Sequence, residues 1–209
     1  MDLARKIYTG LGWFLCLGVA AYAFQAPLGN AAQKLQFLAF HLEARPLVFM
    51  AHIFGGATAL AVLPLQFTQR LRQGRWLAWH RWIGRLYGVA ILIGGLAGLW
   101  LSITTDSPLP AALGFGALAV AWLAVTGFGI YLAMTKQISR HRVWMTYSAA
   151  LTCAAVSLRV QLPLLTLAGL PIEPAYIFVA WSCWVPSLAA VWLWRNWKTA
   201  QQPGLIREA

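Results

Sequence analysis

The chain has 209 residues, of which 60% are hydrophobic and 10% are charged, whereas a soluble domain has roughly 25% charged residues. Its mean hydropathy is +0.65. These values exclude a disordered chain, a coiled coil and an ordinary soluble domain, because a soluble fold of this size would expose too much apolar surface. The net charge of +11 would indicate nucleic-acid binding in a soluble protein. In a membrane protein it is typical of basic cytoplasmic loops, so no nucleic-acid partner is expected.

Six apolar stretches are long enough to form transmembrane helices, which need about 20 residues each. They cover approximately residues 9–26, 47–67, 83–102, 111–135, 143–167 and 175–194. The prediction is therefore an all-α integral membrane bundle with six transmembrane helices in a single domain, residues 1–209, surrounded by lipid. The first stretch also resembles a signal peptide, because it has a basic start and an Ala21-Tyr22-Ala23 motif. We interpret it as a retained helix.

The basic residues concentrate at one end of the predicted bundle. Twelve lie there, namely Arg5, Lys6, Arg70, Arg72, Arg75, Arg81, Lys136, Arg140, Arg142, Arg195, Lys198 and Arg207. The loops at the other end have two, Lys34 and Arg45. Because Lys and Arg accumulate on the cytoplasmic side of a membrane protein, both termini are predicted to be cytoplasmic, in the inner membrane of a bacterium.

Two polar side chains are predicted inside the bilayer, near its outer leaflet. His52 lies in the second span and Arg159 in the fifth, at a similar depth for a rise of about 1.5 Å per residue. Polar groups in a bilayer are costly and are therefore candidates for function. We expect Arg159 to face the bundle interior, within reach of His52 or of an outer-loop acid such as Glu173. The alternatives are a structural pair and a site for a charged ligand.

A second polar cluster is predicted at the cytoplasmic ends of spans two, three and five. Its members are Gln66, His80, Arg81, Arg85, Tyr87, His141 and Arg142. It is either a belt of interfacial anchors or a site for a cofactor or a quinone headgroup.

A b-type heme is one cofactor that such histidines would suit. In a helical bundle it takes axial histidines from facing helices, small residues beside the ring and arginines near its propionates. We therefore expect His80 and His141 to approach each other as candidate ligands of the heme iron. His52 is a further candidate, and its nearest possible second ligand is His41.

Several other kinds of chemistry lack support in the sequence. There is no CxxCH attachment motif, and the three cysteines lie in apolar runs without zinc-site spacing, so we interpret them as small buried side chains. Hydrolysis is disfavoured, because there is no HExxH motif, no nucleophile elbow and no carboxylate inside a span. Whether the protein is an enzyme stays open.

The order of the polar residues resembles that of a known family. The pattern comprises His52-x2-Gly55, Pro64-Leu65-Gln66-Phe67, Arg70, His80-Arg81-x2-Gly84-Arg85-x-Tyr87, His141-Arg142-x-Trp144-Met145 and Arg159. Over about residues 47–163 it resembles a bacterial family of multi-pass predicted membrane proteins, domain of unknown function 2306. The resemblance implies a multi-helix membrane bundle and singles out the same polar residues, but it implies no activity. The helix-end histidines also resemble those of small b-type membrane cytochromes.

Three functions follow as hypotheses. The first is electron transport with heme b or a quinone. The second is a transporter or small-molecule-binding protein that uses Arg159 and His52. Against the second, no span shows a clear Gly/Pro break at mid-depth, although Pro163 and Pro186 are placed to kink their helices. The third is a non-catalytic subunit or assembly factor of a larger membrane complex, with the Trp-rich sixth span facing another membrane subunit.

Overall fold

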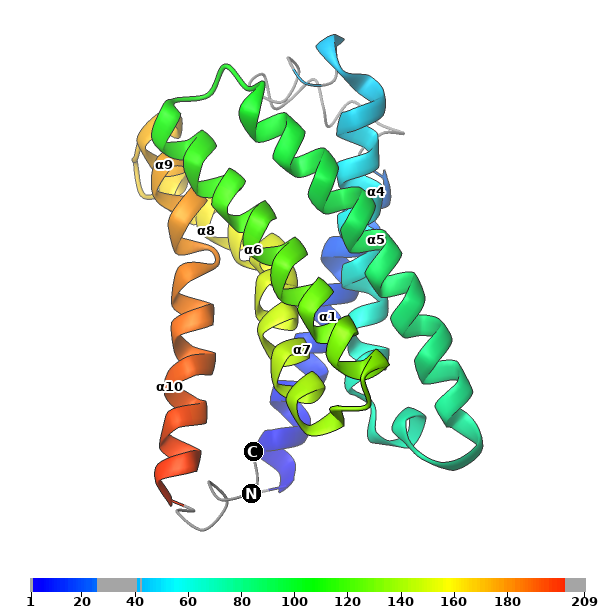
Figure 1. Ribbon diagram of the computed structural model, residues 1–209. Helices are drawn as coiled ribbons and strands as arrows, with labels where there is room; N and C mark the ends of the chain where they lie inside the picture. The colour runs from blue at the N-terminus through cyan, green and yellow to red at the C-terminus, as the bar shows by residue number, and fades with distance from the viewer. Residues whose placement is uncertain (1, 26–40, 42, 202–209) are drawn as a thin grey trace.

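The computed structural model describes residues 2–25, 41 and 43–201, and every regular element among them is a helix. Its helices are α1 (Asp2–Gln25), α4 (Pro46–Phe67), α5 (Leu77–Ile103), α6 (Leu109–Met134), α7 (Ile138–Thr152), α8 (Ala154–Leu167), α9 (Ile172–Ser182) and α10 (Val185–Gln201), with short 3-10 helices η2 (Gln69–Arg72) and η3 (Gly74–Trp76) between α4 and α5 (Figure 1). Five segments are long and apolar enough to cross a membrane, and the apolar part of α1, Thr9–Gln25, is shorter. The prediction of an all-α membrane bundle is confirmed.

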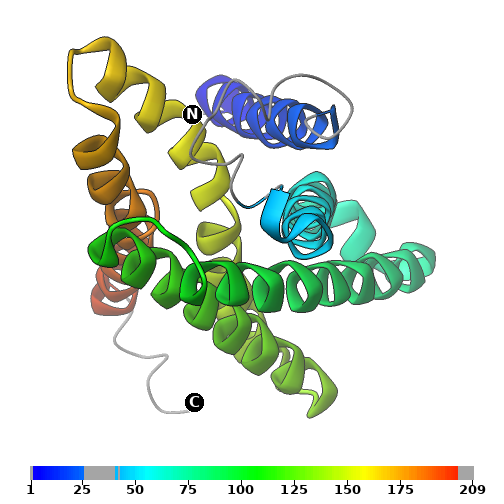
Figure 2. The ribbon, with the colours of Figure 1, turned by 90° about the horizontal axis from the view of Figure 1, so that it is seen from above.

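The crossings alternate in direction, so that α1 begins and α10 ends at the same end of the bundle (Figure 1). The α4–α5 connection and the α6–α7 turn lie there too and contain Arg70, Arg72, Arg75 and Lys136. We call this the basic end. Seen from above, α1 and α4 lie on one side of the bundle and α9 and α10 on the other, with α7 and α8 between them (Figure 2).

Glycines let α4 and α5 approach to backbone contact. A Cβ atom built on Gly55 would lie 2.6 Å from the Gly94 nitrogen and 2.7 Å from the Ala90 carbonyl oxygen. Helices in lipid associate by close packing of small residues, since lipid offers no hydrophobic driving force between them. This contact fixes the depth of α4 against α5 and therefore positions His52, which lies one turn away.

Two of the spans are interrupted, one at Cys153, where the search for Gly/Pro breaks found nothing, and one beside Pro186, where a kink was expected. The span Ile138–Leu167 divides at Cys153, where the Thr152 hydroxyl donates to the Ser148 carbonyl at 2.9 Å. Such a bond to the residue four positions earlier bends helices. Because neither glycine nor proline lies at this break, the search for Gly/Pro signals missed it.

The second break, between α9 and α10, is caused by Pro186. Its ring has no N–H and clashes with the carbonyl four residues earlier, and α9 accordingly ends at Ser182. Gln161 of α8 replaces the backbone hydrogen bond that the Ser182 carbonyl loses. Its Nε2 donates to the Ser182 carbonyl at 3.4 Å, and the Ser182 hydroxyl donates to Gln161 Oε1 at 2.6 Å. Gln161 therefore joins two spans.

Helices α5 and α7 begin about five residues earlier than their apolar stretches do, at Leu77 and Ile138. Their first turns contain His and Arg, and that of α5 also contains tryptophans, so hydropathy does not indicate that they are helical. Trp82 is exposed, and the Arg85 guanidinium lies over its ring at 4.6 Å from the centroid. Such amphipathic rings favour the headgroup layer, which explains a helical turn outside the apolar run.

Candidate functional site: the His52 cavity

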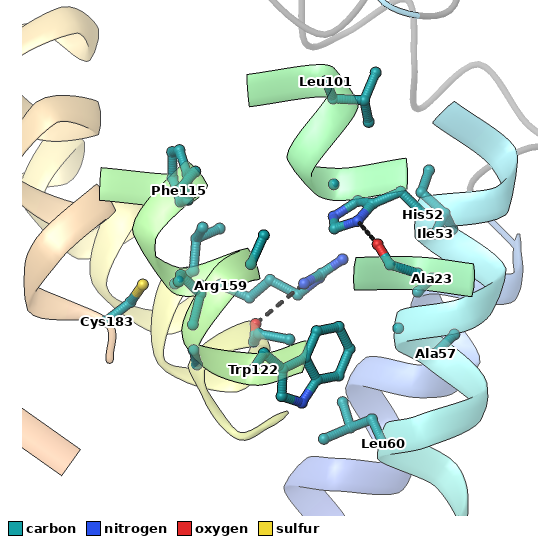
Figure 3. Close-up of a pocket in the computed structure, with 18 of the residues that line it drawn as sticks. Ala23, His52, Ile53, Ala57, Leu60, Leu101, Phe115, Trp122, Arg159 and Cys183 are labelled. Atoms are coloured by element: carbon teal, nitrogen blue, oxygen red, sulfur yellow. Dashed lines mark hydrogen bonds between the residues drawn. The ribbon is translucent and has the colours of Figure 1, made fainter. Parts of the chain in front are cut away.

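A cavity of about 680 Å³ is lined by residues of α1, α4, α5, α6, α7, α8 and α9 (Figure 3), and its lining also includes Thr105 and Ser107, which lie at the end of the bundle opposite the basic end. This volume is in the usual range for small-molecule sites, which are mostly apolar with a few placed polar groups. Most of its wall is aliphatic, aromatic or glycine. The polar groups deepest in it are His52 and Arg159, and we call it the His52 cavity.

His52 enters the cavity from α4 with a fixed orientation. Its Nδ1 lies 2.9 Å from the Gly94 carbonyl oxygen, which only accepts hydrogen bonds, so Nδ1 carries the proton. In the neutral ring Nε2 then presents a lone pair. The ring lies over Gly98, where a Cβ atom would be 2.7 Å from Nδ1. Gly98 thus provides the space that the imidazole occupies, and the side chain stays exposed to the cavity.

Arg159 enters from α8 and extends between His52 and Trp122 (Figure 3). Its Nη1 donates to the Ala155 carbonyl at 3.1 Å, and the structure records no ion pair between it and a described residue. Arg159 faces the interior near His52, as expected. The other expected partner, Glu173, is an exposed residue of the first turn of α9. A cation with spare donors therefore lies in the cavity.

The end of the cavity away from the basic end is polar. His41 Nε2 lies 3.2 Å from Thr105 Oγ1, and Thr105 donates to Ser107 Oγ at 2.9 Å. Burial, and then the charge of Arg45, lower the pKa of His41. Ser107 also hydrogen-bonds the Tyr176 hydroxyl. These groups could exchange protons between the cavity and the adjacent water.

A network of hydroxyl groups adjoins the cavity through Trp122 and Thr152, which line it. The Tyr87 hydroxyl lies 2.9 Å from Ser148 Oγ and 2.7 Å from Thr152 Oγ1. Trp122 Nε1 donates to Thr152 Oγ1 at 2.9 Å, and Thr126 Oγ1 lies 2.7 Å from Ser148 Oγ. Because the Thr152 proton goes to the Ser148 carbonyl, Tyr87 donates to Thr152 and accepts from Ser148. All these donors are used, so this network joins α5, α6 and α7.

In this network the Tyr87 hydroxyl donates its proton to Thr152 Oγ1, so it cannot donate a hydrogen bond to a cofactor. The sequence analysis did not identify the hydroxyl partners of Tyr87, because it concentrated on charged and aromatic residues. Ser148 and Thr152 do carry a signal, since they are polar and one turn apart on the same helix face in an apolar span.

The second polar cluster lies at the basic end, where His80 and His141 come within electrostatic range of each other and of Arg72, Arg81 and Arg142. His141 Nδ1 donates to the Gly129 carbonyl at 2.7 Å. His80 Nδ1 is buried without a hydrogen-bond partner among the described residues.

Other members of this cluster have separate contacts. Gln66 Nε2 donates to the His80 carbonyl at 3.2 Å, and its side chain lies over Gly84. Arg85, stacked on Trp82, is exposed like Arg81 and Arg142. Within the described part of the chain, no three His, Cys, Asp or Glu residues gather as a metal site, so a metal held here would rest on the two histidines.

A comparison with protein families matches most of the chain, including these residues, to one family. The family model described as "Predicted membrane protein (DUF2306)" matches residues 49–195, which include His52, Arg159 and both histidines of the basic end but not α1. No curated protein and no solved structure matches the chain. The chain belongs to the DUF2306 family of predicted multi-pass membrane proteins, whose function is unknown.

Proposed function

We propose that the protein binds a redox cofactor, b-type heme or a quinone, in the His52 cavity and takes part in electron transfer. The observation that carries the proposal is the pairing of His52 and Arg159 in one apolar cavity. The Gly94 carbonyl holds Nδ1 and leaves the Nε2 lone pair for a ligand, while Arg159 offers unpaired donors beside it.

Both cofactors use groups of this kind, and a heme on His52 would require the Arg159 side chain to move aside. Histidine ligands of metals usually donate their other ring N–H to a carbonyl or carboxylate, which fixes the ring orientation, and His52 has this arrangement. Arg159 would pair a heme propionate, because guanidinium groups bind carboxylates in a bidentate geometry. For a quinone, the same two groups would bind oxygens on the ring. An apolar wall suits either molecule.

The histidines at the basic end support the electron-transfer part of the proposal. His80 and His141 lie at the opposite end of the bundle from His52, and the orphaned Nδ1 of His80 would gain a partner in a bound group. We propose them as axial ligands of a second heme, which would allow electrons to cross the membrane between two positions.

Purification in mild detergent tests the proposal, with oxidised and reduced spectra for heme and solvent extraction with mass spectrometry for quinone. We expect one of the two to scale with protein. His52→Ala and Gly56→Leu should lower its content, since Gly56 lines the cavity and a Cβ there meets open space. Gly127→Leu is the matched control, because Gly127 is exposed on α6 outside the cavity. Wild-type protein that carries neither molecule and binds neither when supplied would refute the proposal.

A second candidate, small-molecule transport, gains support from the two broken spans. Transporter sites are typically formed by discontinuous helices, and Thr152 and Cys183, beside the two breaks, both line the cavity. A transporter exchanges its ligand quickly, whereas a cofactor remains bound through purification. Retention of the ligand after extended washing in ligand-free detergent would favour the cofactor, and rapid loss with rapid rebinding would favour transport.

A further inference from the structure

The position of Arg159 restricts what the His52 cavity can hold. Its guanidinium reaches the middle of the cavity, between His52 and Trp122 (Figure 3). A rigid macrocycle on His52 would have to displace it. The other histidine of this cavity, His41, has its Nε2 3.2 Å from Thr105 Oγ1, so a bis-histidine heme would also require that contact to break.

A six-membered ring with an oxygen at each end needs far less room than a macrocycle and can use the same two groups. The lone pair on His52 Nε2 accepts a hydrogen bond from one hydroxyl of a hydroquinone, and Arg159 donates to the other oxygen. The oxidised ring keeps the Arg159 contact.

The cavity also reaches the lipid-facing surface. Tyr22 and Gly18 of α1 and Pro163 of α8 line it and are exposed, Tyr22 by 51%. A Cβ atom on Gly18 would meet open space. Because these residues belong to the apolar part of α1 and to a candidate span, the opening between α1 and α8 faces hydrocarbon, where a ligand with an apolar tail is dissolved.

We infer that the ligand is a lipid-borne quinol or quinone, with its head between His52 and Arg159 and its isoprenoid tail leaving the bundle between α1 and α8. This inference rests on the proposed function and narrows it to one ligand class and one route. His41, Thr105 and Ser107 also line the cavity, and they would exchange protons with the head.

The test uses the full chain in lipid nanodiscs, stripped of endogenous quinone, and titrates ubiquinone with two isoprene units while following tryptophan fluorescence. Gly18→Leu should weaken binding by about tenfold or more, as a steric conflict of 1–3 kcal/mol does. Gly12→Leu, on the same helix at an open position outside the cavity, should stay within about twofold. Arg159→Lys, which keeps the charge but loses the planar fork, should weaken binding, and size-exclusion profiles should match the wild type.

Four results would overturn the inference. Equal affinities of Gly18→Leu and Gly12→Leu would show that the route between α1 and α8 is wrong. Oleate that binds more tightly than quinone, and competes with it, would identify an anionic lipid tail as the ligand instead. Heme-loaded protein that binds no quinone would remove this inference while leaving the proposed function standing, whereas protein that takes neither molecule would remove both.

Discussion

At the residue scale, Arg159 is a cation kept inside the membrane without a carboxylate partner among the described residues. A structural arginine would be held by an ion pair, and its loss would be strongly destabilising. Arg159 instead has one hydrogen bond, to the Ala155 carbonyl of its own helix. We expect its cost in the bilayer to be offset in part by hydrogen bonds to the ligand that we propose for the cavity, rather than by the fold.

This leads to a prediction about Arg159→Leu. The variant should melt at the same temperature as the ligand-free wild type or higher, but its ligand affinity should fall by about tenfold or more, because a hydrogen bond to a charged group is worth roughly 1.5–3 kcal/mol. Arg159→Lys should have a ligand affinity between those of the wild type and Arg159→Leu. Thermal unfolding and ligand content, measured together, check this. Undiminished ligand content in Arg159→Leu would contradict it.

The second prediction concerns Gly98, the floor beneath the His52 ring. In Gly98→Ala the new methyl group would lie 2.7 Å from His52 Nδ1, so the imidazole must leave the Gly94 carbonyl. We expect a loss of about 1–3 kcal/mol of stability, as in other overpacked sites, together with reduced ligand content. Gly127→Ala, at an open position on α6, is the control. If both variants bind ligand equally well, the orientation of His52 does not matter for binding.

At the scale of helix pairs, the α4–α5 contact depends on Gly55 but not on the adjacent Gly56. A Cβ on Gly55 meets backbone atoms of α5 at 2.6–2.7 Å, whereas one on Gly56 meets open space. Gly55→Ala should therefore destabilise the protein by about 1–3 kcal/mol, while Gly56→Ala should be neutral or stabilise by about 0.5–1 kcal/mol through backbone entropy. Thermal unfolding in detergent of the two variants gives the comparison, and similar melting temperatures would show that α4 and α5 can separate without cost.

The break between α9 and α10 leads to a prediction about the energetic coupling of Gln161 and Pro186. Gln161→Leu should cost about 1 kcal/mol, the usual size of an interhelical hydrogen bond in a membrane, because the Ser182 carbonyl loses its partner. In a Pro186→Ala background the helix can recover that carbonyl through its own backbone. The cost of Gln161→Leu should then shrink, and a double-mutant cycle of unfolding free energies would show it. Strictly additive effects would mean that Gln161 does not serve the broken helix.

At the scale of the whole molecule, the arrangement of the ends makes the orientation testable. The beginning of α1 and the end of α10 lie together at the basic end, and basic loops are usually cytoplasmic. We propose that this end faces the cytoplasm of a bacterial inner membrane. A green fluorescent protein fused after Ala209 should fluoresce, and a periplasmic phosphatase fused there should be inactive. An active phosphatase would show that the basic end faces the opposite side of the membrane.

The sequence was sufficient for the features that depend on composition along the chain. Hydropathy located the helices, and the rarity of charges inside spans led to His52 and Arg159, which do share a cavity. It was insufficient where the deciding contact lies between distant segments. The Gly94 carbonyl that orients His52 and the shared hydroxyl network around Tyr87 each require helices that are 20 or more residues apart to meet. The break at Cys153 was missed because the search looked for glycine and proline, and neither lies there.

The wall that α1 contributes to the cavity has a consequence for specificity. The family model covers residues 49–195, so it includes His52 and Arg159 but not α1. On the proposed route, the groups that hold the head and the helix that admits the tail are separate parts of the chain. A change in the bulk of Gly18 would then retune which tails are admitted without disturbing the groups that hold the head.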